Sequence, residues 1–432
     1  MSESTTDASD IRVSGLTVLL PTKREAGNLP WLIRRLHEEL DDVVGALEIL
    51  IVDAPTDDGT EEIAKKEGCT YIADNNGFAE ALRIGFRSAK HPWIVTMDAD
   101  GSHDPVYVRW LLRYANQADL VINSRYLPRA GQESSWFRTF TSKVLNQYLG
   151  IVCSMPIKDL SGGFKLYRKA IFDHIKLESR AFEIQSEIGI KAYGMGFRLL
   201  EVPFYYRPRM EGTSKAAIFS FGMAFLKRSL LLRSWRNSRH FCDYDERAYN
   251  SRIPIQRIWQ RKRHAIIMSL MDPFGRTLNV GCGTDRLVIG YPNVVGVDTN
   301  LACLRYLAND ERKLIQADAT KLPFADGSFE KAYCCEVIEH IDDEAAPLAE
   351  LYRILEPGGT AVISTPNYGG IAWPLLEKIY EMTLAHHREG HKHPTRHTRK
   401  SLRNALEAVG FAIEKEADMY GSILFVKVRK PK

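Results

Sequence analysis

The sequence predicts an α/β protein with two consecutive, largely parallel sheets, and three observations lead to this prediction. Strand-like apolar runs alternate with helical patterns in two separate blocks, at about 12–235 and 271–432. Acidic or glycine-rich segments follow several of these runs, where open α/β sheets bind ligands. The length of 432 residues also favours two or three domains over one core.

The expected elements follow this alternation along the chain. In the first block we expect strands at Leu16–Leu20, Leu47–Val52, Trp93–Met97 and Leu120–Ile122, and helices at Leu29–Leu40, Thr60–Glu67 and Phe78–Ala89. In the second we expect strands at Thr277–Val280, Val294–Val297, Leu314–Gln316, Lys331–Cys335 and Thr360–Ser364. Residues 1–11 are expected to form a disordered tail, and 236–270 a linker with helical segments.

Composition narrows the class of protein. The chain is 45% hydrophobic and 26% charged, and it lacks both a membrane-spanning apolar run and the basic start of a secretory signal. Seven cysteines without a C-x-x-C pair favour a reducing cytoplasm over a disulfide framework. The net charge of +4 does not indicate nucleic-acid binding, and no nucleic-acid partner is expected.

A pair of carboxylates follows the third expected strand. Asp98 and Asp100 are two residues apart, so both side chains can lie on one side of the chain as the strand opens into a loop. Hard carboxylate oxygens suit Mg²⁺ or Mn²⁺, and such a metal can stabilise a departing diphosphate. Because D-x-D is also common in loops and helix caps, this pair alone does not decide between a catalytic and a structural role.

Six further motifs lie before and after Asp98 and Asp100 along the first block. They are Pro21–Glu25, Asp53–Thr60, Asn123–Tyr126, Asp159–Arg168, Phe182–Glu187 and Arg209–Lys215. With these motifs, residues 14–230 resemble a family-2 inverting glycosyltransferase of the polyprenyl-phosphate (dolichyl-phosphate) mannose synthase type. The resemblance implies a GT-A-type domain that binds a GDP- or UDP-linked sugar and a polyprenyl phosphate acceptor.

The resemblance also implies roles for individual residues. Pro21, Thr22, Glu25 and Asp53 would border the nucleoside, and Asp98 and Asp100 would hold the metal and the diphosphate. Arg209, Ser214 and Lys215 would close over the diphosphate. Arg125 and Arg138 would hold the acceptor phosphate, a task that suits the planar guanidinium. The sequence departs from the family pattern at Lys23, Ala54 and Ser102.

The chemistry depends on the acceptor. A lipid phosphate is already mostly ionised at neutral pH and needs no general base. A glycan hydroxyl needs one, and Asp159 and Glu187 are then the candidates, although each can equally be a residue that supports the fold.

A basic apolar segment follows the last motif of the first block. Between Arg207 and Arg239 the chain has eight Lys or Arg and one acid, Glu211. Read as a helix, the segment at about 216–239 is amphipathic and basic, so it can lie on an anionic membrane. We therefore expect a cytoplasmic protein peripheral to the membrane. The alternative is a helix that packs on the core and keeps a solvated basic face.

A glycine-rich turn opens the second block. Gly281, Cys282 and Gly283 follow a strand, and Asp298 ends the next one, 17 residues after Gly281. Glycine allows close approach to a ligand, and an acid at this spacing can accept ribose hydroxyls. A tight turn without a ligand gives the same short pattern.

Later segments add to this pattern: Gln316–Ala319, Lys321–Phe324, Glu336–His340 and Glu350–Gly359. Residues 275–428 thus resemble a class I S-adenosylmethionine-dependent methyltransferase with a Rossmann-like fold. The resemblance implies that Gly281, Cys282 and Gly283 border the methionine part of that cofactor and Asp298 its ribose. Asp318 and Ala319 would flank the adenine, and Glu336 would lie near the cofactor. Asn279 and Asp285 depart from the family pattern, and Asp285 is expected to crowd the turn.

Several readings stay open. The histidines 386, 387, 391, 393 and 397 can form a solvated loop, assist the methyl acceptor or, least favoured, bind a metal; His340 has the same ambiguity. The sequence favours a bifunctional enzyme that transfers a sugar to a polyprenyl phosphate and methylates a sugar or related small acceptor. One alternative transfers sugar to a glycan hydroxyl and methylates the same glycan. Another has a degenerate methyltransferase domain that serves as a binding scaffold.

Overall fold

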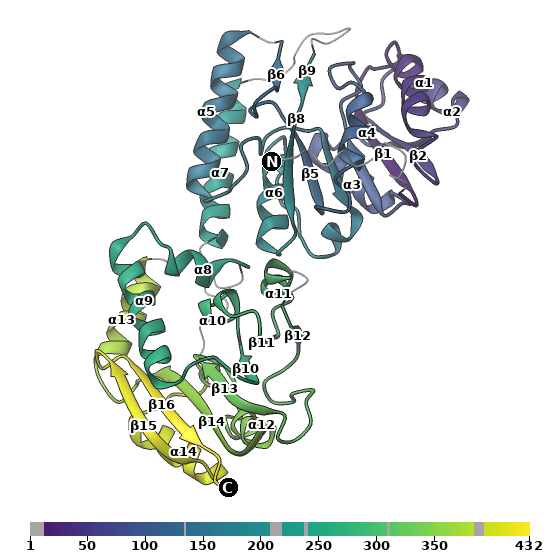
Figure 1. Ribbon diagram of the computed structural model, residues 1–432. Helices are drawn as coiled ribbons and strands as arrows, with labels where there is room; N and C mark the ends of the chain where they lie inside the picture. Colours follow the sequence, from purple (N-terminus) through teal and green to yellow (C-terminus); the bar gives the residue numbers. More distant parts are fainter. Residues whose placement is uncertain (1–12, 134, 208–217, 237–240, 309–311, 384–392) are drawn as a thin grey trace. The chain divides into compact units, whose positions relative to one another are not determined.

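The computed structural model describes residues 13–133, 135–207, 218–236, 241–308, 312–383 and 393–432. The tail predicted at 1–11 lies outside the described residues. The chain divides into two compact units (Figure 1). The N-terminal unit contains residues 1–193 and 197–233, and the C-terminal unit contains 194–196 and 234–432. Within the described ranges, no helix is both long and apolar enough to cross a bilayer.

The N-terminal unit is built on a seven-stranded sheet in the order β3-β2-β1-β4-β7-β5-β8. Its strands are β1 (Leu16–Thr22), β2 (Leu47–Asp53), β3 (Thr70–Ala73), β4 (Trp93–Thr96), β5 (Leu120–Ser124), β7 (Lys165–Arg168) and β8 (Leu199–Pro203). The four strands from β3 to β4 are parallel, whereas β7 runs antiparallel between β4 and β5. A short pair, β6 (Gly131–Gln132) and β9 (Tyr205–Tyr206), lies apart from this sheet.

The helices of this unit are α1 (Leu29–Leu40), α2 (Thr60–Lys66), α3 (Phe78–Ser88), α4 (Val106–Leu112), α5 (Trp136–Val152), α6 (Ile184–Gly194), most of α7 (Ile218–Arg236) and the 3-10 turn η1 (Lys169–Asp173). The core forms because β1 is apolar on both faces, as expected for a central parallel strand. On one face, Leu16, Val18 and Leu20 belong to the same buried cluster as Leu29 and Leu32 of α1.

The C-terminal unit has a second seven-stranded sheet, in the order β12-β11-β10-β13-β14-β16-β15. The strands are β10 (Thr277–Val280), β11 (Val295–Asp298), β12 (Leu314–Gln316), β13 (Phe329–Cys335), β14 (Leu355–Pro366), β15 (Ala412–Met419) and β16 (Ile423–Arg429). Strands β12 to β14 are parallel, and β16 is antiparallel to both neighbours. The predicted GT-A-type and Rossmann-like α/β classes are confirmed.

The helices of this unit are α8 (Tyr244–Tyr249), α9 (Pro254–Leu270), α10 (Arg286–Gly290), α11 (Leu301–Leu307), η2 (Ile338–His340), α12 (Ala345–Ile354), α13 (Ala372–Thr383) and α14 (Arg399–Val409). The segment 236–270, expected as a linker, contributes α8 and α9 to this unit. Ile267 and Leu270 of α9 are buried in one cluster with Tyr333, Val362 and Phe425 of the sheet. This apolar packing makes α9 part of the domain core.

Asp285 has a structural role that the sequence pattern did not indicate. Rather than crowding the turn, its Oδ1 accepts hydrogen bonds from the backbone N–H groups of Leu287 (2.9 Å) and Val288 (3.2 Å), so it caps α10. Its Oδ2 accepts from Asn279 Nδ2 at 3.0 Å. Burial raises the pKa of Asp285 to about 6, although these hydrogen bonds oppose the shift.

Asp285→Asn is therefore expected to alter how stability depends on pH. An aspartate with a folded-state pKa of about 6 binds its proton more tightly than in the unfolded chain. Its contribution to stability is full at low pH and is lost as pH rises through that value. Because asparagine caps a helix without titrating, the variant should gain on the order of 1–3 kcal/mol relative to wild type between pH 4.5 and 8.

Urea unfolding of the full chain at several pH values measures this difference. Asp343→Asn is the matched control, because Asp343 is exposed and also accepts a backbone N–H, from Ala345 at 3.1 Å. A difference between Asp285→Asn and wild type that does not change with pH would contradict the assignment.

Candidate active sites

The carboxyl ends of β1 and β2 meet at one edge of the N-terminal sheet. Thr22 of β1 is in register with Asp53 of β2, and Pro21 precedes it on the same strand. Asp53 is buried, and its two carboxylate oxygens accept hydrogen bonds from Thr22 Oγ1 (2.8 Å) and Tyr71 OH (3.2 Å). Burial raises the pKa of Asp53, and these two hydrogen bonds counteract it. The side chain is thus fixed at the edge where the sequence placed the nucleoside.

The loops after β1 and β2 are tied together. Asn28 Nδ2 donates to Glu25 Oε2 at 2.8 Å, which orients the Glu25 carboxylate. Asp58 Oδ2 accepts from the backbone N–H of Ala26 at 3.3 Å, while its Oδ1 accepts from Thr60 Oγ1 at 2.9 Å at the start of α2. Of the predicted nucleoside site, Pro21 and Thr22 therefore end β1, Asp53 ends β2, and Glu25 lies in the loop after β1 that is tied to the loop after β2.

The D-x-D pair follows β4 at the same edge. Asp98 keeps 40% of its side chain exposed, whereas Asp100 is buried. Ser102 donates to Asp100 Oδ1 from both its backbone N–H (3.0 Å) and its hydroxyl (2.5 Å). The backbone N–H of Asp98 donates to His103 Nδ1 at 2.9 Å, and His103 stacks on Phe164 at 4.7 Å. These contacts fix the loop that carries both carboxylates.

The donor set fits a hard divalent cation. The two carboxylates are two residues apart in this loop, and one of them faces solvent, so oxygen ligands from a diphosphate have access. Gly163 lies beside them: a Cβ there would be 4.0 Å from Asp98 Oδ1 and 3.6 Å from Gln185 Nε2. Gly163 thus lies close to the loop that carries Asp98 and Asp100, and a larger residue at 163 would narrow this space.

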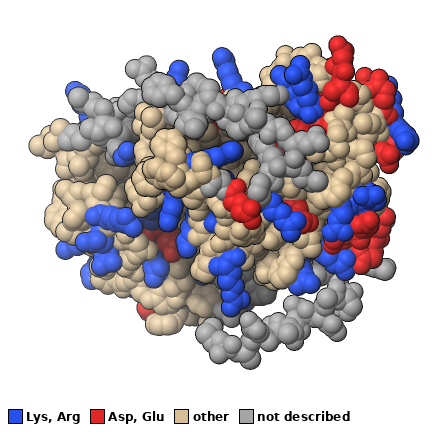
Figure 2. Space-filling model, turned by 90° about the horizontal axis from the view of Figure 1, so that it is seen from above, with Lys and Arg blue, Asp and Glu red and all other residues tan. Residues whose placement is uncertain are grey.

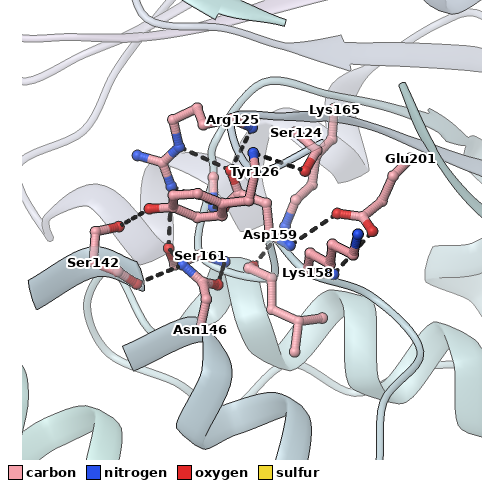
Figure 3. Close-up of polar contacts among 12 residues, drawn as sticks. Ser124, Arg125, Tyr126, Ser142, Asn146, Lys158, Asp159, Ser161, Lys165 and Glu201 are labelled. Atoms are coloured by element: carbon pink, nitrogen blue, oxygen red, sulfur yellow. Dashed lines mark hydrogen bonds and ion pairs between the residues drawn. The ribbon is translucent and has the colours of Figure 1, made fainter. Parts of the chain in front are cut away.

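Arg125 is held by a buried ion pair (Figure 3). Its Nε and one terminal nitrogen donate to Asp159 Oδ2 and Oδ1, both at 2.8 Å, and Asp159 is fully buried. Asp159 also accepts the backbone N–H groups of Arg125 and Gly162. Burial acts to raise the pKa of Asp159, but the charge of Arg125 and its hydrogen bonds outweigh it, and the net pKa is lowered. Asp159 therefore serves to position Arg125.

The rest of this network positions the Asp159 loop. Glu201 accepts the backbone N–H groups of Lys158 (2.9 Å) and Asp159 (2.8 Å), and Asn146 Nδ2 donates to Ser161 Oγ at 2.8 Å. The Lys165 ammonium is fully buried and donates to the backbone carbonyls of Leu160 and Gln185, and burial lowers its pKa to about 7.

Glu187 also has a supporting role. It accepts the backbone N–H of Ser179 at 2.7 Å and pairs with Lys191 (2.7 Å) and Arg228. Burial would raise the pKa of Glu187, but the charge of Lys191 and the hydrogen bonds lower it overall.

Arg138 lies on α5 with an exposed side chain. Arg209, Ser214 and Lys215 lie outside the described residues. Two residues at this edge carry no predicted role, namely His103 and Gln185. His103 lies five residues after Asp98 in the sequence, whereas only the fold brings Gln185 beside Gly163.

The second site lies at the carboxyl edge of β10 and β11. Gly281 and Gly283 have positive φ angles of 66° and 45°. The backbone N–H of Gly283 donates to Asp298 Oδ2, and that of Asn300 donates to Asp298 Oδ1, both at 2.7 Å. Burial raises the pKa of Asp298, and these hydrogen bonds counteract it. Cys282 between the glycines is buried, so the turn presents backbone rather than side chain.

Packing requires glycine at both ends of this turn. A Cβ on Gly281 would lie 2.3 Å from Val337 Cγ2, and one on Gly283 would lie 2.5 Å from Asp245 Oδ2, so a larger residue at either position would collide with these side chains. Asp245 also accepts the backbone N–H of Thr284 at 3.4 Å. Sequence reasoning missed Asp245 because it lies on α8, in the expected linker.

Three other predicted residues lie at the ends of the neighbouring strands. Asp318 follows β12, is exposed and accepts from Thr320, and Ala319 beside it is buried. Glu336 follows β13, has a φ of 57°, and pairs with Arg263 of α9 at 2.8 Å. The predicted residues of this site thus all lie at or just after the ends of neighbouring strands, at one edge of the sheet. They are Gly281, Cys282, Gly283, Asp298, Asp318, Ala319 and Glu336.

The histidines separate into two groups. His386, His387 and His391 lie outside the described residues. His393 is buried beside His340, with ring centroids 4.8 Å apart, and His397 pairs with Glu344 at 2.9 Å.

Comparison with known proteins agrees with this division. The family description "Glycosyl transferase family 2" matches residues 17–176, and the description "Methyltransferase domain" matches residues 278–363. The chain is 32% identical over 234 residues to a polyprenol monophosphomannose synthase from Mycolicibacterium smegmatis, covering 48% of this chain and 84% of that protein.

Two further relatives match the same half. An undecaprenyl-phosphate mannosyltransferase from Micrococcus luteus is 30% identical over 212 residues, covering 46% of this chain and 85% of that protein. A dolichol-phosphate mannosyltransferase from Pyrococcus furiosus is 31% identical over 211 residues, covering 46% of this chain and 58% of that protein. The chain therefore belongs to glycosyltransferase family 2, and it carries a methyltransferase domain in its C-terminal half.

Proposed function

We propose that the N-terminal unit transfers a sugar, with inversion, from a GDP- or UDP-linked donor to a polyprenyl phosphate. The C-terminal unit uses S-adenosylmethionine to methylate a sugar or related small acceptor. Both activities belong to one cytoplasmic chain peripheral to the membrane. The relatives named for polyprenol, undecaprenyl phosphate and dolichol phosphate support the acceptor class.

One observation favours a phosphate acceptor over a glycan hydroxyl. The two acidic residues considered as general bases, Asp159 and Glu187, are both buried in ion pairs, and the pKa of each is lowered. A carboxylate held in this way is a poor proton acceptor. A lipid phosphate needs none, because it is already ionised and requires only positioning and a stabilised leaving group.

The donor site then has a simple division of labour. Asp53 and Glu25, with Pro21 and Thr22, border the nucleoside, and Asp98 and Asp100 would hold Mg²⁺ or Mn²⁺ against the diphosphate. Such a metal supplies charge stabilisation as the diphosphate leaves. We assign Arg209, Ser214 and Lys215 to the diphosphate and Arg125 and Arg138 to the acceptor phosphate.

The glycine turn supports an active methyltransferase rather than a degenerate scaffold. Gly281 and Gly283 present backbone at the strand edge, and Asp298 ends the adjacent strand. Cys282 between them borders the methionine part with its backbone. Asp318 and Ala319 are assigned to the adenine, and Glu336 to the neighbourhood of the cofactor.

The surface of α5 supports contact with a membrane. This helix buries Asn146 and Leu149, and it exposes large apolar residues: Trp136 (78%), Phe137, Phe140 (58%), Val144 and Ile151. Arg138 and Lys143 are exposed on the same helix. So much exposed apolar surface is costly in water and suits a helix whose outer face enters the headgroup region.

Of the segment predicted at 216–239, the structure describes α7, which adjoins this surface. Tyr148 of α5 and Ser229 of α7 are hydrogen-bonded at 3.1 Å, so the two helices pack together (Figure 1). On the described part of α7, Leu226, Leu230 and Leu231 are exposed, while Arg228 pairs with Glu178 and Glu187. In Figure 2, Lys and Arg side chains are spread over the face drawn, and acidic ones gather mostly toward its right side. We propose that α5 and α7 together contact anionic lipid.

Asp100→Asn should lower sugar transfer to a polyprenyl phosphate at least about 100-fold and leave methyl transfer unchanged, because only the diphosphate site loses a ligand. Asp298→Ala should give the opposite pattern. The measurement is product mass analysis with mixed nucleotide sugars, lipid phosphate and isotopically labelled S-adenosylmethionine. The matched controls are Asp173→Asn and Asp326→Asn, both exposed aspartates. If Asp100→Asn transfers sugar at the wild-type rate, the metal assignment is wrong.

The double variant Trp136→Ser, Phe140→Ser should bind vesicles of phosphatidylglycerol and phosphatidylcholine at least about tenfold more weakly, because two aromatic side chains no longer enter the bilayer surface. Co-sedimentation measures the binding, which should also weaken as salt screens the basic residues. Trp110→Ser, at another exposed tryptophan of the same unit, should bind as wild type does. Equal binding by the double variant would rule out α5 as the contact.

A further inference from the structure

A cluster of metal-ligating side chains lies in the C-terminal unit, outside the glycine turn. Glu339, His340 and His393 each place a ligand atom within 4.8 Å of the other two. Glu339 and His393 are buried, and His340 is exposed. Within the residues that the structure describes, this is the one group of three or more such side chains arranged in this way.

The fold brings the three residues together from distant parts of the chain. Glu339 and His340 form η2, immediately after β13 and three to four residues beyond Glu336. His393 belongs to a segment anchored against η2, because Thr395 Oγ1 donates to the carbonyl of Ile341 at 2.8 Å. The cluster is therefore at the carboxyl edge of the sheet, the same edge that carries the glycine turn.

Neighbouring side chains orient two members of the cluster. Thr365 Oγ1, near the end of β14, donates to Glu339 Oε2 at 3.2 Å. Tyr368 OH lies 2.6 Å from His393 Nδ1 and also donates to Glu377 Oε1 at 2.9 Å, and that oxygen is 3.4 Å from His393 Nδ1. A histidine whose Nδ1 is held by a tyrosine and a carboxylate presents Nε2 as the ligating atom, the usual arrangement behind a metal-bound imidazole.

We propose that Glu339, His340 and His393 form a site for a divalent transition-metal ion, such as Zn²⁺, Mn²⁺ or Fe²⁺. Two imidazoles and one carboxylate are a set that leaves coordination positions open on one side. Metal–ligand bonds of about 2.0–2.2 Å place ligand atoms roughly 3–4 Å apart, so the three side chains close by about an ångström on binding. The exposed His340 marks the side from which ion and substrate enter.

If the C-terminal unit transfers methyl groups as proposed, this metal site indicates an acceptor with two neighbouring hydroxyl groups. A metal with open positions binds two neighbouring oxygens, as in the vicinal diol of a sugar, and lowers the pKa of the hydroxyl it holds. In the transfer, the acceptor oxygen forms a bond to the methyl carbon as the sulfur–methyl bond breaks. The sulfonium becomes a neutral thioether, and the hydroxyl proton passes to water.

Cobalt titration of the full chain tests the site without any methyl acceptor. Asp98→Asn with Asp100→Asn is used as the background, so that the N-terminal carboxylates do not compete. After treatment with EDTA, Co²⁺ alone is added and followed by visible absorption and by metal content after gel filtration. We expect one Co²⁺ per chain. Glu339→Gln or His393→Ala should weaken binding at least tenfold, and Tyr368→Phe about 10–100-fold.

Two controls make the result specific. His37→Gln removes an exposed histidine of the N-terminal unit, and a triple variant at His386, His387 and His391 removes the neighbouring histidines; both should keep the cobalt spectrum. Loss of the spectrum in the triple variant, or its persistence in His393→Ala and Glu339→Gln, would overturn the proposal.

Calorimetry with S-adenosylmethionine on each variant separates this proposal from the proposed function and reports on folding. If the protein binds S-adenosylmethionine but not cobalt, the proposed metal site is wrong and the proposed methyl transfer stands. If it binds cobalt but not S-adenosylmethionine, the metal site stands and the proposed methyl transfer is wrong.

Discussion

Buried or half-buried carboxylates held by hydrogen bonds at the carboxyl edges of the parallel strands of two sheets are the constraint on which both sites depend. A charge removed from water costs several kcal/mol unless donors replace the lost hydration. Asp53, Asp100 and Asp298 each receive such donors from a neighbouring hydroxyl or backbone N–H. The same bonds fix where each carboxylate lies, so stability and the geometry of the site have one cause.

The Arg125–Asp159 pair extends this principle to the arginine that we propose as a ligand of the acceptor phosphate. Its two parallel hydrogen bonds fix the guanidinium plane, and Glu201 and Asn146 in turn fix the Asp159 loop. Because Asp159 is paired with Arg125 and its pKa is lowered, it positions the arginine and is a poor general base. This arrangement therefore suits an acceptor that is already charged, and it gives a structural reason why a phosphate rather than a hydroxyl is the substrate that we propose.

The sequence predicted most central strands to within a residue or two, because apolar runs that end in acids or glycines are typical of parallel sheets. It also placed Pro21, Asp53, Asp98 and Asp298 at strand ends. It did not reveal pairs that only tertiary packing creates. Arg263 meets Glu336 across 73 residues, and Asp245 reaches Gly283 from a segment expected as a linker.

The periodicity of apolar residues in a sequence also does not tell whether the apolar face of a helix is buried or exposed. The apolar stripe of α5 would pass as a core stripe, and only the structure shows that Asn146 takes the buried position while Trp136 and Phe140 face outward. Asp285 is a similar case. Seen as a departure from a family pattern it appears disruptive, yet in the fold it caps a helix and accepts a hydrogen bond from Asn279.

A crystal structure of the full chain grown with a nucleoside diphosphate, Mn²⁺ and S-adenosylhomocysteine tests the central claim most directly. The account predicts Mn²⁺ and diphosphate density against Asp98 and Asp100, and ribose hydroxyls against Asp298 beside the Gly281–Gly283 turn. Density for either nucleotide-bearing ligand away from its sheet edge, with Asp98 or Asp298 untouched, would contradict it.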